Sequence, residues 1–319
     1  MFKKFFSSGA VVRPIIVIAT ILTSLSSLFI RLANAPSIIL VFYRVTIASL
    51  LMLPYVILKC RDELRRVIKT RDLALSLLSG AFLGVHFYLY FESLKLTSIT
   101  SAVILVNVEV FFVAFAMLFI LREKISLRVW RGIIVAFIGS VIIALADANS
   151  GNDNLIGDIF AFLGAGAMAV YTLIGRVCRR NMSTALYTYI LYTASAITTL
   201  LMAVLSGTPL TGYSTDNILY AALLAVLCTI LGHSVFSWGL KFETPAFISI
   251  AKLMQPFYAA IVGVIVFREI PSALVVVGGV IVIAGIYDYT KGTSPNPQPI
   301  TPDNGGGDGD GNNTVSTSD

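Results

Sequence analysis

The chain has 319 residues, of which 57% are hydrophobic and only 13% are charged, and its formal net charge is +6. Soluble domains carry about 25% charged residues, so this composition excludes a soluble enzyme, a disordered chain and a disulfide-rich secreted scaffold. The apolar residues come in runs of about 18–24, the length of a helix that crosses a ~30 Å hydrocarbon core. We therefore predict an all-α polytopic membrane protein.

Ten apolar segments follow one another along the chain, and short polar connectors separate them. In chain order the membrane helices are predicted at residues 14–32, 37–58, 72–94, 99–121, 128–146, 157–176, 184–205, 217–240, 245–267 and 272–289. The composition changes after the last of them. Residues 290–319 are rich in Pro, Gly, Asp and Asn without an apolar pattern, and we expect a disordered tail there.

The positions of the basic residues predict the orientation in the membrane. With a cytoplasmic N-terminus, the inner loops hold 18 of the 23 lysines and arginines and the outer loops hold three, while Arg44 and Lys252 fall inside predicted spans. Cytoplasmic loops of membrane proteins carry such an excess. We expect a multi-pass protein of the plasma or inner membrane with both termini in the cytoplasm. Since the positive charge lies in these connectors, nucleic acid is not an expected partner.

The sequence also repeats itself without gaps at an offset of 146 residues. This offset places Arg122-Glu123 on Arg268-Glu269, Gly132 on Gly278 and Gly139 on Gly285. Because each copy holds five helices, an odd number, the second copy must cross the membrane upside down, as in secondary transporters. The predicted organisation is a cytoplasmic segment (1–13), a first five-helix repeat (14–146), an extracytoplasmic linker (147–156), a second, inverted five-helix repeat (157–289) and the cytoplasmic tail (290–319).

Two long segments carry a resemblance to a known family. GAFLGVHFYLYFESLKLTSITSAVILVN, from Gly80, and LGHSVFSWGLKFETPAFISIAKLMQPFYAAIVGVIVFREIPS, from Leu231, resemble the two repeats of the drug/metabolite transporter superfamily, EamA type. The resemblance covers about residues 14–289. It implies two five-helix bundles, a central cavity walled mainly by helices 1, 3, 4, 6, 8 and 9, and helices 5 and 10 outside. The implied activity is transport of amino acids, other metabolites or drugs.

The chain departs from that family at the middle of helices 4 and 9, where a proline is usual. Pro256 supplies it in helix 9, but the matching position of helix 4 is Val110, preceded by Glu109. At the repeat offset Glu109 aligns with Gln255. A proline removes one backbone hydrogen bond from a helix, so we expect Pro256 to act as a hinge.

Charges inside the spans are the strongest chemical signal, because an ionised group at a helix centre costs about 2.5–3.5 kcal/mol. Counted from the predicted helix ends, Glu109 and Lys252 lie at depths that leave an axial gap of only ~6 Å between them. They are interpreted either as a structural ion pair that joins the repeats or as groups that handle substrate or protons. Arg44 is expected to be structural, with its long side chain reaching toward the outer surface.

Further polar and aromatic residues are candidates for the same site. They are His86, Tyr90, Asn107, His233, Trp238 and Gln255. On helical spacing His86 shares a face with Tyr90. A lone histidine in a membrane is often a satisfied hydrogen-bonding group, and aromatic residues at helical spacing often only pack, so these alternatives remain open.

The prediction that follows is a secondary transporter working by alternating access, as an exporter or exchanger of a small metabolite, with an amino acid or similar zwitterion in first place. A phosphorylated metabolite, a nucleotide derivative or a drug is the alternative substrate, and a channel or structural membrane protein the alternative class. No GxSxG, HExxH or P-loop motif indicates an enzyme. No cofactor or metal is expected, and the expected partners are the substrate and the lipid bilayer, with a homodimer left open.

Overall fold

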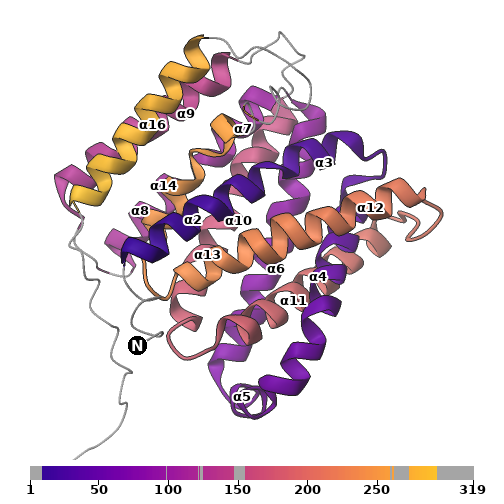
Figure 1. Ribbon diagram of the computed structural model, residues 1–319. Helices are drawn as coiled ribbons and strands as arrows, with labels where there is room; N and C mark the ends of the chain where they lie inside the picture. The colour runs from indigo at the N-terminus through magenta and orange to yellow at the C-terminus, as the bar shows by residue number, and fades with distance from the viewer. Residues whose placement is uncertain are drawn as a thin grey trace, which may run out of the picture.

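The computed structural model describes residues 9–97, 99–120, 122, 125–146, 155–258, 261 and 273–292 (Figure 1). Within these ranges the chain consists of helices and their connections, without a strand. Most of the predicted linker and tail lie outside the described residues, as do the first eight residues and most of the second half of the predicted ninth helix. The prediction of an all-α membrane fold is confirmed.

The helices follow the two predicted repeats in order. The first repeat contains α2 (Gly9–Ser24), α3 (Ser26–Leu32), α4 (Ser37–Lys59), α5 (Arg61–Val67), α6 (Arg71–Leu96), α7 (Ile99–Asn107), α8 (Glu109–Phe119) and α9 (Leu127–Ala146). The second contains α10 (Leu155–Cys178), α11 (Thr184–Leu205), α12 (Thr215–Leu223), the π-helix η1 (Leu224–His233), α13 (Ser234–Gly239), α14 (Pro245–Lys252) and α16 (Ala273–Gly292).

Each predicted span coincides with one or more of these helices. In the described part of the chain, 8 helical stretches are long and apolar enough to cross a membrane, and they correspond to predicted helices 1–4, 6–8 and 10. The fifth predicted helix is α9, and the ninth begins as α14. Most starts agree with the prediction to within two residues, but α2 already includes Gly9, and Pro14 therefore lies inside it.

The two repeats are interleaved rather than placed side by side. Across the repeat boundary α10 packs against α6, α11 against α4 and α6, η1 against α2, α14 against α8, and α16 against α9. These contacts form symmetric pairs when the helices are numbered 1–10 as predicted. Exchanging the two repeats turns the contact of helix 1 with helix 8 (α2 with η1) into that of helix 6 with helix 3 (α10 with α6). It leaves the contacts of α4 with α11, α8 with α14 and α9 with α16 unchanged. This is the pseudo-two-fold relation expected of an inverted repeat.

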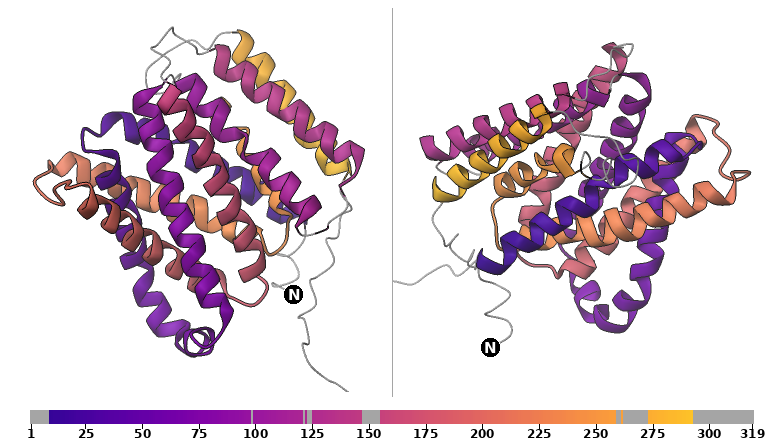
Figure 2. Two further views of the ribbon diagram at one scale, coloured as in Figure 1. Left: turned by 180° about the vertical axis from the view of Figure 1, so that it is seen from behind. Right: turned by 45° about the horizontal axis from the view of Figure 1, so that its top comes forward.

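Helices α9 and α16 form a separate pair at one edge of the bundle (Figures 1 and 2). Glycines bring their backbones together: a Cβ added to Gly139 would lie 2.8 Å from the Gly278 carbonyl oxygen, and one added to Gly132 would lie 2.8 Å from the Gly285 carbonyl oxygen. These are the glycines that match at the repeat offset. Small residues at a helix interface allow close approach in membranes, and here they attach the outermost helix of one repeat to that of the other.

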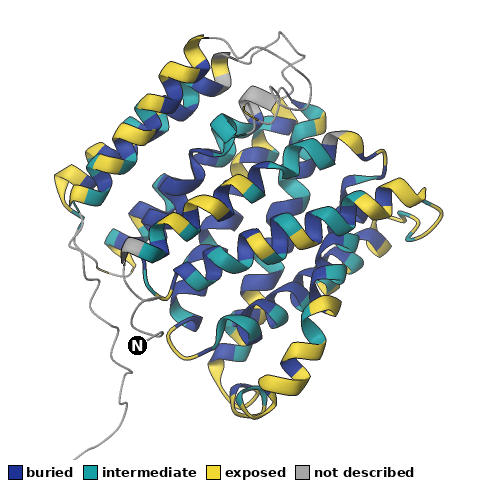
Figure 3. Cartoon of the chain, viewed as in Figure 1, coloured by how far each residue is buried: buried dark blue, intermediate teal, exposed yellow. Residues whose placement is uncertain are grey.

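Burial follows the same plan. Buried residues line the faces where the two repeats meet, and exposed residues lie along the outer faces and at the ends (Figure 3). Many of the exposed side chains are large and apolar, among them Leu50, Ile138 and Val280. Apolar surface of this extent is what a bilayer covers. The polar groups that require explanation are therefore the buried ones at the centre.

Candidate functional site

Two helices are interrupted at equivalent points of the two repeats. Helix 4 divides into α7 and α8 at Val108, and helix 9 leaves the α-helical geometry after Lys252, turns at Leu253 and Met254, and resumes at Gln255. Val108 and Met254 are one repeat offset apart. At both points the chain tightens, because the amide of Val108 donates to Leu105 O and that of Met254 to Ala251 O, three residues back, each at 3.2 Å. Discontinuous helices of this kind form substrate sites in many transporters.

Only one of the two interruptions has a proline beside it. Pro256 lacks an amide hydrogen, so the carbonyl of Lys252 loses the donor it would have in a continuous helix. Helix 4 has Val110 at the matching position and is interrupted all the same. The sequence pattern therefore indicated the interruption in helix 9 and missed the one in helix 4.

Glu109 and Lys252 meet at these interruptions. Lys252 Nζ donates to Glu109 Oε1 at 3.1 Å and to Oε2 at 3.2 Å. Glu109 is 6% and Lys252 5% exposed, so the pair lies inside the protein. Ser249 Oγ also donates to Glu109 Oε1 at 2.9 Å, and Thr172 Oγ1, which shares its one proton with Met168 O, lies 3.2 Å from the same oxygen. The carboxylate of the first repeat is thus held by three side chains of the second.

The helix ends favour both charges. Glu109 is the first residue of α8 and Lys252 is the last residue of α14. A carboxylate at a helix N-terminus and an ammonium at a C-terminus each gain about 0.3–1 kcal/mol from the helix dipole, and up to ~2 kcal/mol when partly buried. Each charge therefore keeps part of its stabilisation if the two side chains separate.

An aromatic row leads away from the pair. Lys252 Nζ lies 5.5 Å from the centroid of the Phe236 ring, and the Phe236 and His233 ring centroids are 5.8 Å apart. His233 in turn lies 5.0 Å from Phe87, centroid to centroid, and 6.4 Å from Tyr171. Among the described residues, the buried Nδ1 atom of His233 has no hydrogen-bond partner. This nitrogen can therefore bond a group outside the described part of the chain.

The other histidine candidate is satisfied. His86 Nδ1 lies 2.9 Å from the carbonyl oxygen of Gly164, and its ring stacks on Tyr90 with centroids 6.2 Å apart. The contact with Gly164 joins α6 of the first repeat to α10 of the second. His86 and Tyr90 thus share a face, as the helical spacing predicted.

The remaining candidates contact different neighbours. Asn107 Nδ2 donates to Ser140 Oγ of α9 at 2.8 Å, and the ring of Trp238 packs on Phe242 with centroids 5.1 Å apart. Gln255 Nε2 donates to Thr23 Oγ1 of α2 at 2.7 Å. The contact of Gln255 with helix 1 repeats, in the other half, the contact of Glu109 with Thr172 of helix 6.

Three residues that contribute to the polar interior were not site candidates from the sequence. Ser249 precedes Lys252 by three residues and so shares its helix face, which was a usable signal. Thr172 gave no signal, because a threonine can satisfy its hydroxyl within its own helix, as this one also does with Met168 O at 2.9 Å. Arg44 is the third.

The expectation that Arg44 reaches the outer surface is wrong. Arg44 is 2% exposed, its Nε donates to Thr229 Oγ1 at 2.6 Å, and its guanidinium lies 4.0 Å over the ring of Phe87. The face of α4 that carries Arg44 turns inward, toward η1 and α6. Distance along a helix, on which the expectation rested, does not decide which face a residue occupies.

At the end of the bundle that the basic loops predict to be cytoplasmic, one polar contact joins the two repeats and others join segments of the second repeat. Arg13 Nε of α2 lies 2.8 Å from Glu243 Oε1 in the connector that follows α13, and Arg176 of α10 donates to Glu243 O at 3.2 Å. In the neighbouring connector Arg179 donates to Ser237 O at 3.0 Å. Burial lowers the pKa of Arg179 to about 10, so its guanidinium stays charged at neutral pH.

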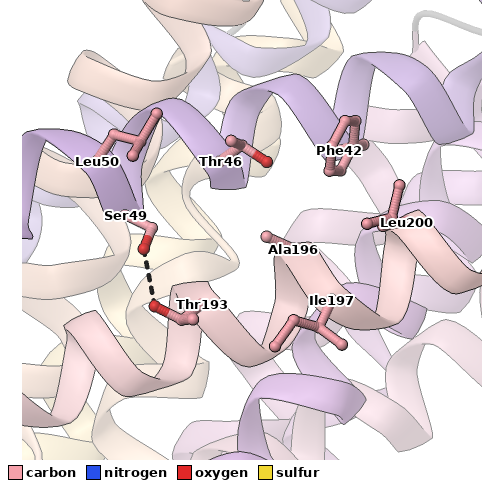
Figure 4. A pocket seen from close by; sticks show the side chains of 8 residues that line it. All are labelled: Phe42, Thr46, Ser49, Leu50, Thr193, Ala196, Ile197 and Leu200. Atoms are coloured by element: carbon pink, nitrogen blue, oxygen red, sulfur yellow. Dashed lines mark hydrogen bonds between the residues drawn. The ribbon is translucent and has the colours of Figure 1, made fainter. Parts of the chain in front are cut away.

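A cavity of about 210 Å³ lies elsewhere, in the groove between α4 and α11 (Figure 4). It is lined by Phe42, Thr46, Ser49, Leu50, Thr193, Ala196, Ile197 and Leu200. The hydroxyls of Ser49 and Thr193 bond to each other at 2.7 Å, and the exposed Leu50 and Ile197 belong to the outer, apolar surface. This groove shares no lining residue with the Glu109–Lys252 pair. Within the described ranges, no group of three or more His, Cys, Asp or Glu residues forms a metal site.

Comparisons with known proteins agree with this architecture. The profile of the EamA-like transporter family matches residues 14–145 and again residues 155–288. The chain is 25% identical over 252 residues to an uncharacterized transporter of Archaeoglobus fulgidus, covering 78% of this chain and 86% of the relative. It is 26% identical over 281 residues to the uncharacterized transporter YxxF of Bacillus subtilis, covering 88% of each.

A solved structure shares the fold. It superposes with a TM-score of 0.73 at 17% identity, covering 89% of this chain and 98% of that one. The two matches of the family profile together span most of the sequence, and each coincides with one of the five-helix repeats. On these grounds the chain belongs to the EamA-like transporter family.

Proposed function

We propose that this transporter carries a small zwitterionic metabolite, with an amino acid in first place, and that Glu109 and Lys252 recognise its two charged groups. The observation that carries the proposal is the buried Glu109–Lys252 pair, which joins the two repeats at the two helix interruptions. A ligand with an ammonium and a carboxylate offers each of these side chains a partner of opposite charge.

Charge balance explains why a zwitterion suits the site. A buried charge that loses its partner costs about 3–5 kcal/mol, so a ligand of one sign would leave Glu109 or Lys252 uncompensated. A zwitterion replaces both contacts at once. The helix ends and the hydroxyls of Ser249 and Thr172 continue to stabilise the charges during this exchange.

The same contact links binding to movement. Glu109 belongs to the first repeat and Lys252 to the second, so a ligand that separates them changes how α8 and α14 pack. Alternating access in inverted-repeat transporters is a movement of one repeat or bundle against the other around a fixed site. We place the carrier in the cell membrane with both termini in the cytoplasm, and reporter fusions at the C-terminus test that orientation.

A double-mutant cycle tests the zwitterion site. The variants are Glu109→Gln, Lys252→Met and the double variant, with binding of an amino-acid panel read by thermal unfolding of the purified protein and transport read in proteoliposomes. Each single change is expected to abolish zwitterion binding while the protein stays folded. Asp288→Asn is the matched control, because it removes a carboxylate paired with Arg128 and Arg131 far along α16.

One outcome of this cycle would contradict the zwitterion site. If both single variants lose stability and the double variant regains both stability and transport, the pair is structural. The zwitterion assignment then fails, whereas the assignment to a transporter family, which rests on the whole sequence, is unaffected.

A further inference from the structure

Arg44 is a buried cation that the site described above does not use. It lies on the inward face of α4 and is 2% exposed. Its Nε is bound to Thr229 Oγ1, but its two terminal nitrogens, Nη1 and Nη2, donate to no residue in the part of the chain that the structure describes. A guanidinium has five N–H donors, so the terminal donors of Arg44 are available to a further acceptor.

No described carboxylate compensates this charge. The buried acidic residues are committed elsewhere: Glu109 to Lys252, Glu243 to Arg13, and Asp72 to Asn181 Nδ2 at 3.2 Å. A charge inside a membrane protein ordinarily pairs with another group or faces a wet cavity. The terminal nitrogens of Arg44 are therefore open to an acceptor that the described residues do not supply.

The surroundings hold the guanidinium in one orientation. The Thr229 hydroxyl donates to Leu224 O, five residues back, at 2.9 Å, and so has only lone pairs to offer Arg44. That five-residue step belongs to the π-helix η1, and π-helical turns are rare and frequent at functional sites. The Phe87 ring, 4.0 Å away, supports the flat face of the guanidinium. Arg44 is thus fixed at Nε and across its plane, while its terminal nitrogens have no partner among the residues that the structure describes.

His233 supplies a second unused polar atom nearby. It follows Thr229 by four residues on η1, and its ring meets that of Phe87 at 5.0 Å between centroids. Phe87 therefore contacts both Arg44 and His233. Since no described residue bonds His233 Nδ1, two groups with unused donors or acceptors in this part of the chain lie around one aromatic ring.

We propose that Arg44, together with His233, forms a second binding site that takes a carboxylate group of the transported metabolite. A carboxylate matches the planar fork of an arginine with two parallel hydrogen bonds. The site is separate from Glu109, and the row Phe87, His233, Phe236 connects it to Lys252. A carboxylate bound to Arg44 would therefore lie at one end of this row of rings, and the cation Lys252 lies at the other end. That the ligand is the transported one rests on the proposed function; the anion site itself does not.

Thermal unfolding of the purified protein in a neutral detergent tests the site. The probes are sodium acetate, sodium succinate and sodium phosphate, each replacing sodium chloride at constant ionic strength. Acetate and succinate are expected to raise the unfolding temperature in a saturable way, because a ligand that binds the folded state stabilises it. Arg44→Gln is expected to weaken that response about tenfold or more. Arg128→Gln, which removes an exposed arginine, is the control and keeps the response.

The outcomes separate the alternatives. If Arg44→Gln leaves the carboxylate response unchanged, or only phosphate stabilises the protein, the proposal is overturned. If Arg44→Gln does not fold, Arg44→Lys and His233→Leu decide, since both are expected to weaken the response and a wild-type affinity in both refutes the site. If the carboxylate response depends on Arg44 but the Glu109–Lys252 cycle shows a structural pair, only this anion site is supported. If the response does not depend on Arg44 but each single change at Glu109 or Lys252 abolishes zwitterion binding, only the proposed function is supported.

Discussion

Replacing glycine by alanine should change the stability of the protein in opposite directions at Gly285, in the α9–α16 interface, and at Gly166, in α10. A Cβ on Gly285 would lie 2.7 Å from the Cα and the Cβ of Ala136, closer than real Cβ atoms approach. The backbone of α9 would have to move. A Cβ on Gly166 of α10, which is also in a helix interior, would meet nothing within 4 Å.

The expected magnitudes follow from these contacts. Overpacking of a close interface costs about 1–3 kcal/mol, so Gly285→Ala should destabilise the protein by that amount. Replacing a helical glycine by alanine without a clash gains about 0.5–1 kcal/mol, so Gly166→Ala should stabilise it. At about 2–4 °C per kcal/mol, the two variants should move the unfolding temperature by several degrees down and by one to a few degrees up, respectively.

The assay is thermal unfolding of the purified protein in one detergent, with wild type, both single variants and the double variant measured together. The two sites have no shared neighbours, so their effects should add. Equal shifts of the same sign would show that the α9–α16 backbones do not touch as described. Close approach of the two backbones would then no longer explain why glycines stand at the matched positions Gly132 and Gly278, and Gly139 and Gly285.

Two further predictions concern movement. Pro256→Ala should lower turnover more than substrate affinity, because it restores the hydrogen bond to Lys252 O and stiffens helix 9 at its interruption. Transport kinetics in proteoliposomes check this prediction. A loss of affinity at unchanged turnover would assign Pro256 to binding instead. Glu243→Gln should loosen the contact with Arg13 and open the cytoplasmic end, because a hydrogen bond to a charged group contributes about 1.5–3 kcal/mol. With Cys60 and Cys228 replaced by serine, the buried Cys178 should then react faster with a maleimide, whereas an unchanged rate would show that this contact does not close the protein.

The sequence was informative where a signal extends over many residues. The helices were predictable because a run of apolar residues is a strong pattern, and the repeat was predictable because matched pairs such as Gly139 and Gly285 are spaced by one constant offset. Depth along two such helices was enough to bring Glu109 and Lys252 to the same level. Their contact at 3.1 Å is consistent with that estimate.

The sequence was uninformative where the answer depends on rotation about a helix axis or on one backbone bond. Arg44 was expected at the surface, although its helix face turns inward. The interruption at Val108 has no proline to mark it, and no residue type marks the π-helix η1 that presents Thr229 and packs against α2 and α4. Such features depend on neighbours from the other repeat, which a single sequence does not place.

Under the alternating access proposed above, the unlike residues at the equivalent positions Glu109 and Gln255 would give the protein a preferred resting state. In a symmetric inverted repeat, the inward-open and outward-open forms arise when the two halves exchange conformations, and they would be equal in energy. Here one half has a carboxylate bound to Lys252, while the other has a neutral amide bound to Thr23. Exchange of the two conformations therefore does not regenerate the same contacts. Since each 1.4 kcal/mol of difference is a factor of ten in population, even a small inequality would leave the empty protein open predominantly to one side of the membrane.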